Sequence, residues 1–62
     1  MNIKEKVLSE LILSEGKYCS GGQLAEDFGV SRTAVWKAIE QLKAQGCRID
    51  AVTNKGYLLK EI

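Results

Sequence analysis

Gly29 constrains the fold of this chain more than any other residue, because it separates two short segments that both show helical periodicity. The segment before it repeats apolar residues at the spacing of one helix face, namely Leu24, Ala25 and Phe28. The segment after it begins with Ser31, a residue type favoured at helix N-caps, and continues with Val35, Ala38, Ile39 and Leu42. Glycine readily adopts the left-handed conformation that ends a helix. The sequence therefore predicts two helices, over about residues 20–28 and 31–45, joined by a tight turn.

A further helix is predicted ahead of this pair, over about residues 2–15. Asn2 is expected to cap its N-terminus, and Gly16 is expected to follow its last turn. Its apolar face consists of Ile3, Val7, Leu8, Leu11 and Ile12.

The start of the middle helix has its own signals. Residues 18–19 form a short extended link, and Ser20 with Gln23 completes a Ser-x-x-Gln capping box. Gly21 and Gly22 lower the helix propensity of this first turn. The capping box nevertheless predicts that the helix begins here.

The end of the sequence has the pattern of two short strands. Residues 47–52 alternate, which places Cys47, Ile49 and Ala51 on one face. Asn54 to Gly56 form a turn, because Asn and Gly both tolerate positive φ. Residues 57–60 then form a returning strand with Tyr57 in the core. The whole pattern predicts one mainly α domain over residues 1–62, a three-helix winged helix-turn-helix with a small β-wing.

This arrangement is typical of DNA-binding domains, in which the second helix of the motif enters the major groove. We therefore expect double-stranded DNA as the partner, with contacts from the exposed side of the helix over residues 31–45 and from the wing. The candidate DNA-binding residues are Ser20, Ser31, Arg32, Thr33, Trp36, Lys37, Lys43, Asn54 and Lys55.

Different chemistry is expected of different candidates. Ser31 and the first backbone N–H groups of its helix can hold a phosphate. Arg32 can offer a guanidinium fork to guanine, and Thr33 a hydroxyl and a methyl group. Lys37 and Lys43 are expected to meet phosphates.

Two further residues complete this set. Lys55, at the tip of the wing, is expected to contact the DNA backbone or the minor groove. Trp36 has two interpretations that the sequence leaves open. It either presses on a sugar or a thymine methyl group, or packs under the wing as peripheral core.

Charge and composition limit the alternatives. Residues 1–30 carry three lysines against five acids, whereas residues 31–62 carry six basic residues against three acids. Positive charge therefore gathers in the half that would face DNA. The chain has no histidine, and Cys19 and Cys47 are too few for a thiol zinc site. We expect both to be free thiols, in the core or half-buried, in preference to a disulfide between them. No apolar run is long enough for a membrane span, and we expect a cytoplasmic protein.

Three segments carry a family resemblance: Ser20-Gly-Gly-Gln-Leu-Ala25, Val30-Ser-Arg-Thr-Ala-Val-Trp-Lys37 and Asn54-Lys-Gly-Tyr-Leu-Leu59. In this order and spacing they resemble the N-terminal winged-helix domain of the biotin operon repressors. The resemblance implies a transcriptional repressor, with a DNA-reading helix over residues 31–43 and a wing over residues 53–57. Full-length members make biotinyl-AMP from biotin and ATP, transfer biotin to a carrier protein, and bind a palindromic operator as dimers.

The sequence departs from that family in one respect, because it lacks the Gly- and Arg-rich loop that binds the biotin adenylate. We therefore expect no enzyme activity and no cofactor in this chain, with biotin and ATP belonging to a missing ligase domain. An excised domain of a longer protein is favoured over a stand-alone regulator. The isolated domain is expected to be monomeric, and the full-length protein dimeric on DNA.

Other functions are open to the same fold. The chain could belong to a different metabolite-sensing regulator, or it could be a winged-helix module that docks onto proteins. A small enzyme has little support, because there is no histidine base and no glycine-rich phosphate loop beyond Gly21-Gly22.

Overall fold

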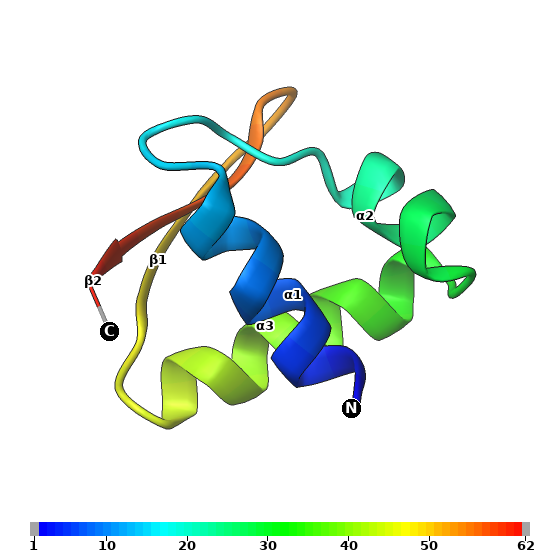
Figure 1. Ribbon diagram of the computed structural model, residues 1–62, viewed down its shortest axis with the longest axis horizontal. Helices are drawn as coiled ribbons and strands as arrows, with labels where there is room; N and C mark the ends of the chain where they lie inside the picture. Colours follow the sequence, from blue (N-terminus) through cyan, green and yellow to red (C-terminus); the bar gives the residue numbers. More distant parts are fainter. Residues whose placement is uncertain (1, 62) are drawn as a thin grey trace.

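The computed structural model describes residues 2–61 and shows three helices followed by a two-stranded antiparallel sheet (Figure 1). The elements are α1 (Ile3–Leu13), α2 (Gly21–Phe28), α3 (Arg32–Ala44), β1 (Arg48–Val52) and β2 (Gly56–Glu61). This confirms the predicted winged helix-turn-helix. The boundaries differ by at most two residues, most clearly at the end of α1, where residues 14–16 form a turn instead of continuing the helix.

Side-chain caps begin all three helices, at the residues that the sequence predicts. Asn2, Ser20 and Ser31 each accept a hydrogen bond from the backbone N–H three residues later, at 2.9, 3.2 and 3.1 Å respectively. A cap of this kind satisfies one of the N–H groups that a helix leaves without a partner at its start. The caps therefore fix where each helix begins.

The predicted capping box at the start of α2 forms only in part. Ser20 accepts from the Gln23 backbone, but the Gln23 side chain donates to Asp27 Oδ1 at 2.8 Å instead of returning to Ser20. At the other end of α2, Gly29 has φ 65° and ψ 37°, the left-handed conformation that was predicted. Val30 N–H then bonds back to Ala25 O at 2.9 Å, which closes the turn between α2 and α3.

The core lies where α1 crosses α3 and α2 packs beside them (Figure 1). Its largest fully buried side chains are Leu24, Ile39, Leu42, Val7 and Val35. Full burial of such a side chain contributes roughly 1.5–3 kcal/mol each. Cys19 and Cys47 are free and half-buried, as predicted, and Tyr57 packs against the edge of the core. The core therefore anchors α3 by one side and the wing by its base.

Strand β1 follows the predicted alternation only at its base. Ile49, paired with Leu59, is 8% exposed and belongs to the core, whereas Ala51, paired with Tyr57, is exposed. The face that the sequence predicts Ile49 and Ala51 to share is therefore buried at Ile49 but not at Ala51.

A backbone bridge between the α1–α2 link and β2 holds the wing in place. Cys19 N–H donates to Tyr57 O, and Tyr57 N–H donates to Cys19 O, both at 2.8 Å. Gly56 makes this approach possible, because a Cβ on it would lie 2.1 Å from Cys19 O and its φ is +114°. The sequence predicts an extended link at this point, and the structure shows that the link pairs with the wing.

Tyr18 adds a side-chain contact beside this bridge. Its hydroxyl donates to Asp50 Oδ2 at 2.7 Å, and Lys55 Nζ lies 5.6 Å from the centre of its ring. The hydrogen bond to Asp50, followed by desolvation and the charge of the carboxylate, raises the pKa of Tyr18 above its ordinary value of 10.0. Tyr18 thus connects the α1–α2 link to β1 and to the wing tip.

Replacing Gly56 by alanine should destabilise the domain strongly, because the added Cβ meets the backbone of Cys19 and the positive φ strains an L residue. We expect a loss of about 3 kcal/mol or more in urea unfolding. Gly16→Ala is the matched control, since Gly16 also has positive φ, +73°, but nothing lies within 4 Å of its added Cβ. It should cost about 1 kcal/mol. Equal losses in the two variants would contradict a tight contact at Gly56.

Alkaline titration of Tyr18, followed by ultraviolet absorbance, should show ionisation above pH 10.0, and Asp50→Ala should move it back toward that value. The folded state favours neutral Tyr18, so the stabilisation from the Asp50 bond is present below pH 10.0 and lost as pH rises through the raised pKa. Tyr18→Phe identifies which absorbance change belongs to this residue. Unchanged ionisation of Tyr18 in Asp50→Ala would contradict the bond.

Candidate nucleic-acid interface

The outer side of α3 is left free by the rest of the domain. Its inner side is buried through Val35, Ala38, Ile39 and Leu42. The five candidate contacts on this helix, Arg32, Thr33, Trp36, Lys37 and Lys43, are all exposed. Because the buried side anchors α3 to the core, the exposed side presents these groups on a fixed helix.

Trp36 is the most unusual of these side chains. It is the chain's single tryptophan and is 53% exposed. Of the two interpretations that the sequence leaves open, packing in the core is therefore excluded. An aromatic ring held on the surface of a fixed helix presents a large apolar area to a partner at little entropic cost.

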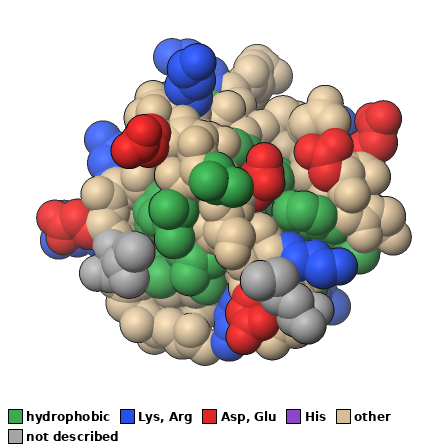
Figure 2. Space-filling view, in the orientation of Figure 1, with side chains coloured by type: hydrophobic (Ala, Val, Ile, Leu, Met, Phe, Trp, Pro, Cys, Tyr) green, Lys and Arg blue, Asp and Glu red, His purple; other side chains and the backbone are tan. Residues whose placement is uncertain are grey.

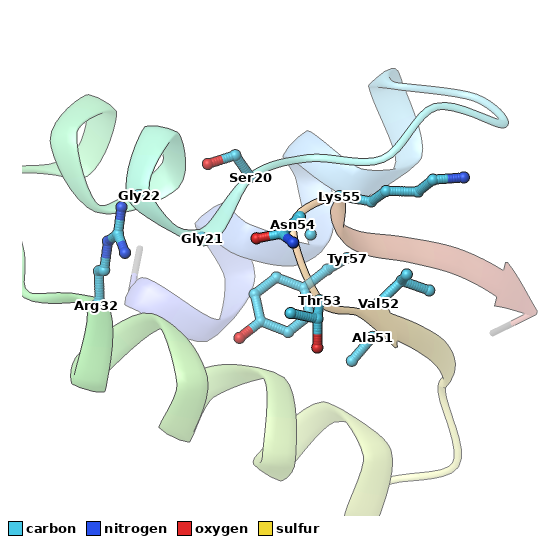
Figure 3. Close-up of a pocket in the computed structure, with 11 residues that line it drawn as sticks. Ser20, Gly21, Gly22, Arg32, Ala51, Val52, Thr53, Asn54, Lys55 and Tyr57 are labelled. Atoms are coloured by element: carbon cyan, nitrogen blue, oxygen red, sulfur yellow. The ribbon is translucent and has the colours of Figure 1, made fainter.

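A depression of about 460 Å³ lies between the start of α2, the start of α3 and the wing (Figure 3). Four of the nine candidates line it: Ser20, Arg32, Asn54 and Lys55. Other residues of the lining are Gly21, Gly22, Ala51, Val52, Thr53, Gly56 and Tyr57. Segments far apart in the sequence therefore build one surface beside the free side of α3.

The side chains at this depression point in different directions. Arg32 reaches from the start of α3 toward Gly22, whereas the Lys55 side chain extends away from the depression (Figure 3). The distant end of Lys55 lies over Tyr18. Both residues are exposed, so each remains accessible to a partner.

Two glycines in the first turn of α2 are the residues whose role the sequence analysis missed. A Cβ on Gly22 would lie 2.4 Å from one guanidinium nitrogen of Arg32, and a Cβ on Gly21 would lie 3.2 Å from the Tyr57 ring. Thr53 and Tyr57 were likewise not among the candidates, although they line the depression. The signal in the sequence was the glycine pair itself. Two glycines weaken the first turn of a helix, so their presence there indicates that close packing requires them.

The remaining candidates lie apart from this depression. Lys43 pairs with Glu40 on the same helix, with 3.4 Å between Nζ and Oε2, and both side chains are partly exposed. Such a surface pair contributes little to stability, so Lys43 stays available for other partners. Lys43 also lines a second depression, of about 420 Å³, together with Arg48 and Lys60, two basic residues that the sequence analysis did not single out.

The opposite face of the domain has a different character. Viewed from the side that α1 covers, acidic, basic and hydrophobic side chains are scattered, and no continuous basic area is visible (Figure 2). Ile12 and Leu13 at the end of α1 are 45% and 77% exposed. Within residues 2–61, no helix is both long and apolar enough to span a membrane. The same residues contain no cluster of three or more potential metal ligands of the His, Cys, Asp and Glu types.

Comparison with known proteins shows which proteins this chain resembles. A bifunctional ligase/repressor BirA from Bacillus subtilis (strain 168) is 46% identical over 55 residues, which make up 87% of this chain and 17% of the relative. A protein of the same name from Escherichia coli (strain K12) is 42% identical over 50 residues, 81% of this chain and 16% of the relative. This chain thus spans about one sixth of the length of these relatives.

The family match covers nearly the whole fold, because residues 4–58 match a family described as an HTH domain. This match agrees with the predicted three-helix fold and with the resemblance seen in the sequence. It also agrees with the prediction that this chain has no enzyme activity of its own, since the matched region is a helix-turn-helix and not a catalytic domain. The chain belongs to the helix-turn-helix domain family, and it is a winged, DNA-binding member of that family.

Proposed function

We propose that this domain reads a DNA operator for a transcriptional repressor, with α3 in the major groove and the wing beside it. The observation that carries this proposal is the free outer side of α3, which the core holds by its opposite side. A helix of about this diameter fits the major groove of B-DNA, where the base edges can be distinguished. The relatives described above are named as ligase/repressors, which supports the same function.

The first turns of α3 supply the chemistry for reading sequence. Thr33 offers a hydroxyl and a methyl group, Trp36 an apolar ring and Lys37 an ammonium group, all exposed. Ser31 caps the start of α3. A helix N-terminus carries unpaired backbone N–H groups and the positive end of the helix dipole, so a phosphate is favoured there. Base contacts would then come from the helix surface, and backbone contacts from its start.

The wing tip and the start of α2 would add contacts that do not depend on the base sequence of the DNA. Asn54 and Lys55 at the wing tip and Ser20 at the start of α2 lie on either side of the depression next to α3 (Figure 3). Contacts to the phosphate backbone position a protein on DNA and make its binding depend on salt. We therefore assign these residues to backbone or minor-groove contacts.

The parent protein is part of this proposal. In a longer cytoplasmic ligase/repressor, biotin and ATP would bind a separate ligase domain, while this domain would need no cofactor to bind DNA. Two copies would bind a palindromic operator, because two-fold related half-sites match a symmetric dimer. The isolated domain would be a monomer and would bind one half-site weakly.

An amide NMR titration with a short palindromic duplex, run beside a scrambled duplex of the same composition, tests the proposal directly. We expect shifts concentrated at residues 31–43 and around Lys55, and larger shifts with one duplex than with the other. The emission of Trp36, the single tryptophan, should change along the same binding curve. If neither duplex causes a shift at low salt, DNA binding by this domain is refuted, and a protein-docking function becomes the better explanation.

Replacing Lys55 by alanine should weaken binding to all duplexes alike and reduce the slope of log K against log salt by about one unit. The reason is that a wing-tip ammonium group replaces one counterion on the DNA without reading a base. Lys6→Ala is a suitable control, because Lys6 is exposed on α1, away from α3's outer side. A salt slope equal to that of the unmodified domain would remove the wing tip from the interface.

A further inference from the structure

The Arg32 guanidinium occupies space that a side chain on Gly22, in α2, would fill. If Gly22 carried a Cβ, that atom would lie 2.4 Å from Nη2 and 3.0 Å from both Cζ and Nε of Arg32. The first distance is shorter than real Cβ atoms show and the other two are tight, so the guanidinium lies directly against the first turn of α2. In Figure 3 the Arg32 side chain points along this direction, toward Gly22 and not outward from the helix.

The surroundings of this guanidinium favour an anion. The depression that Arg32 lines contains no acidic residue, and its polar groups include the hydroxyls of Ser20, Thr53 and Tyr57. Within residues 2–61 the one ion pair joins Lys43 to Glu40, so Arg32 has no carboxylate partner there. A guanidinium without a carboxylate partner, beside a depression whose other polar groups include neutral hydroxyls, suits a bidentate contact to a phosphate.

We propose that Gly22 is a positioning residue that holds Arg32 against the depression between α2 and the wing, where Arg32 binds a phosphate of the DNA backbone and not the edge of a guanine. This assignment rests on the proposed DNA binding and departs from the contact that the sequence alone suggests for Arg32. The Arg32 guanidinium lies against the first turn of α2. Base reading is thereby left to the exposed groups of α3.

Gly22→Ala isolates this effect from the stability of the fold. Gly22 does not have positive φ, and the atoms that its added Cβ meets belong to the end of a flexible side chain. Alanine also has a higher helix propensity than glycine, so the domain should fold and should unfold at the same or a higher temperature. The Arg32 side chain must move, and an NMR signal from its Nε–Hε group should shift even without DNA.

The decisive experiment is a double-mutant cycle, measured on the palindromic and the scrambled duplex at several salt concentrations. Arg32→Ala should lower affinity about tenfold on both duplexes and reduce the salt slope by about one unit. Gly22→Ala should lower affinity by a similar factor, and the double variant should bind no more weakly than Arg32→Ala alone. Gly21→Ala is the matched control, because its added Cβ meets the Tyr57 ring instead of Arg32. Any change in affinity that it causes should therefore be the same in the Arg32→Ala background.

Several results would overturn the assignment. A loss in Arg32→Ala confined to one duplex would make Arg32 a base-reading residue. Unchanged affinity in Gly22→Ala, or an effect that adds fully to that of Arg32→Ala, would show that Gly22 does not position Arg32. If the unmodified domain binds neither duplex, the proposed function and the phosphate contact both fail, whereas an unshifted Arg32 Nε–Hε signal in Gly22→Ala would refute the positioning role alone.

Discussion

The reciprocal backbone hydrogen bonds between Cys19 and Tyr57 are the interaction on which the shape of this domain depends. Without them the wing would be a two-stranded hairpin attached to the core mainly at its base, and an isolated hairpin of this size is marginally stable in water. The bridge ties the hairpin to the α1–α2 link at 2.8 Å in both directions. It forms only because Gly56 has no side chain to separate the two backbones. The place of the wing beside α2 and α3 follows from this contact.

The core holds α3 rigidly by one side and leaves the opposite side free. A chain of 62 residues buries only about 60% of the surface that its unfolded chain exposes, less than a larger domain does, so each buried side chain is important. Helix α1 crosses α3 and covers its inner side, whereas α2 packs beside them. The charged and aromatic residues of the outer side remain in solvent. One side of α3 thus stabilises the fold, and the opposite side is the one that the proposed function uses.

The bridge positions the wing and the core positions α3, and both elements line the depression that also includes the start of α2. Its lining has no acidic residue and combines the guanidinium of Arg32 with the hydroxyls of Ser20, Thr53 and Tyr57. Glycines at the start of α2 let Tyr57 and Arg32 approach the helix closely. These glycines weaken the helix locally, and the close contacts they permit explain why such residues are found there. The same packing that orients the wing therefore also shapes the surface next to α3.

Local chemistry in the sequence determined the elements and their limits. Asn2, Ser20 and Ser31 cap helices whose apolar spacing is visible in the sequence, and Gly29 adopts the left-handed turn because its own backbone permits it. These features depend on residues within a few positions of one another. Tertiary structure alone decided that Trp36 is exposed, that Ala51 lies outside the core and that Arg32 rests on Gly22. Each of these depends on which distant surface is near the residue, and a linear pattern does not contain that information.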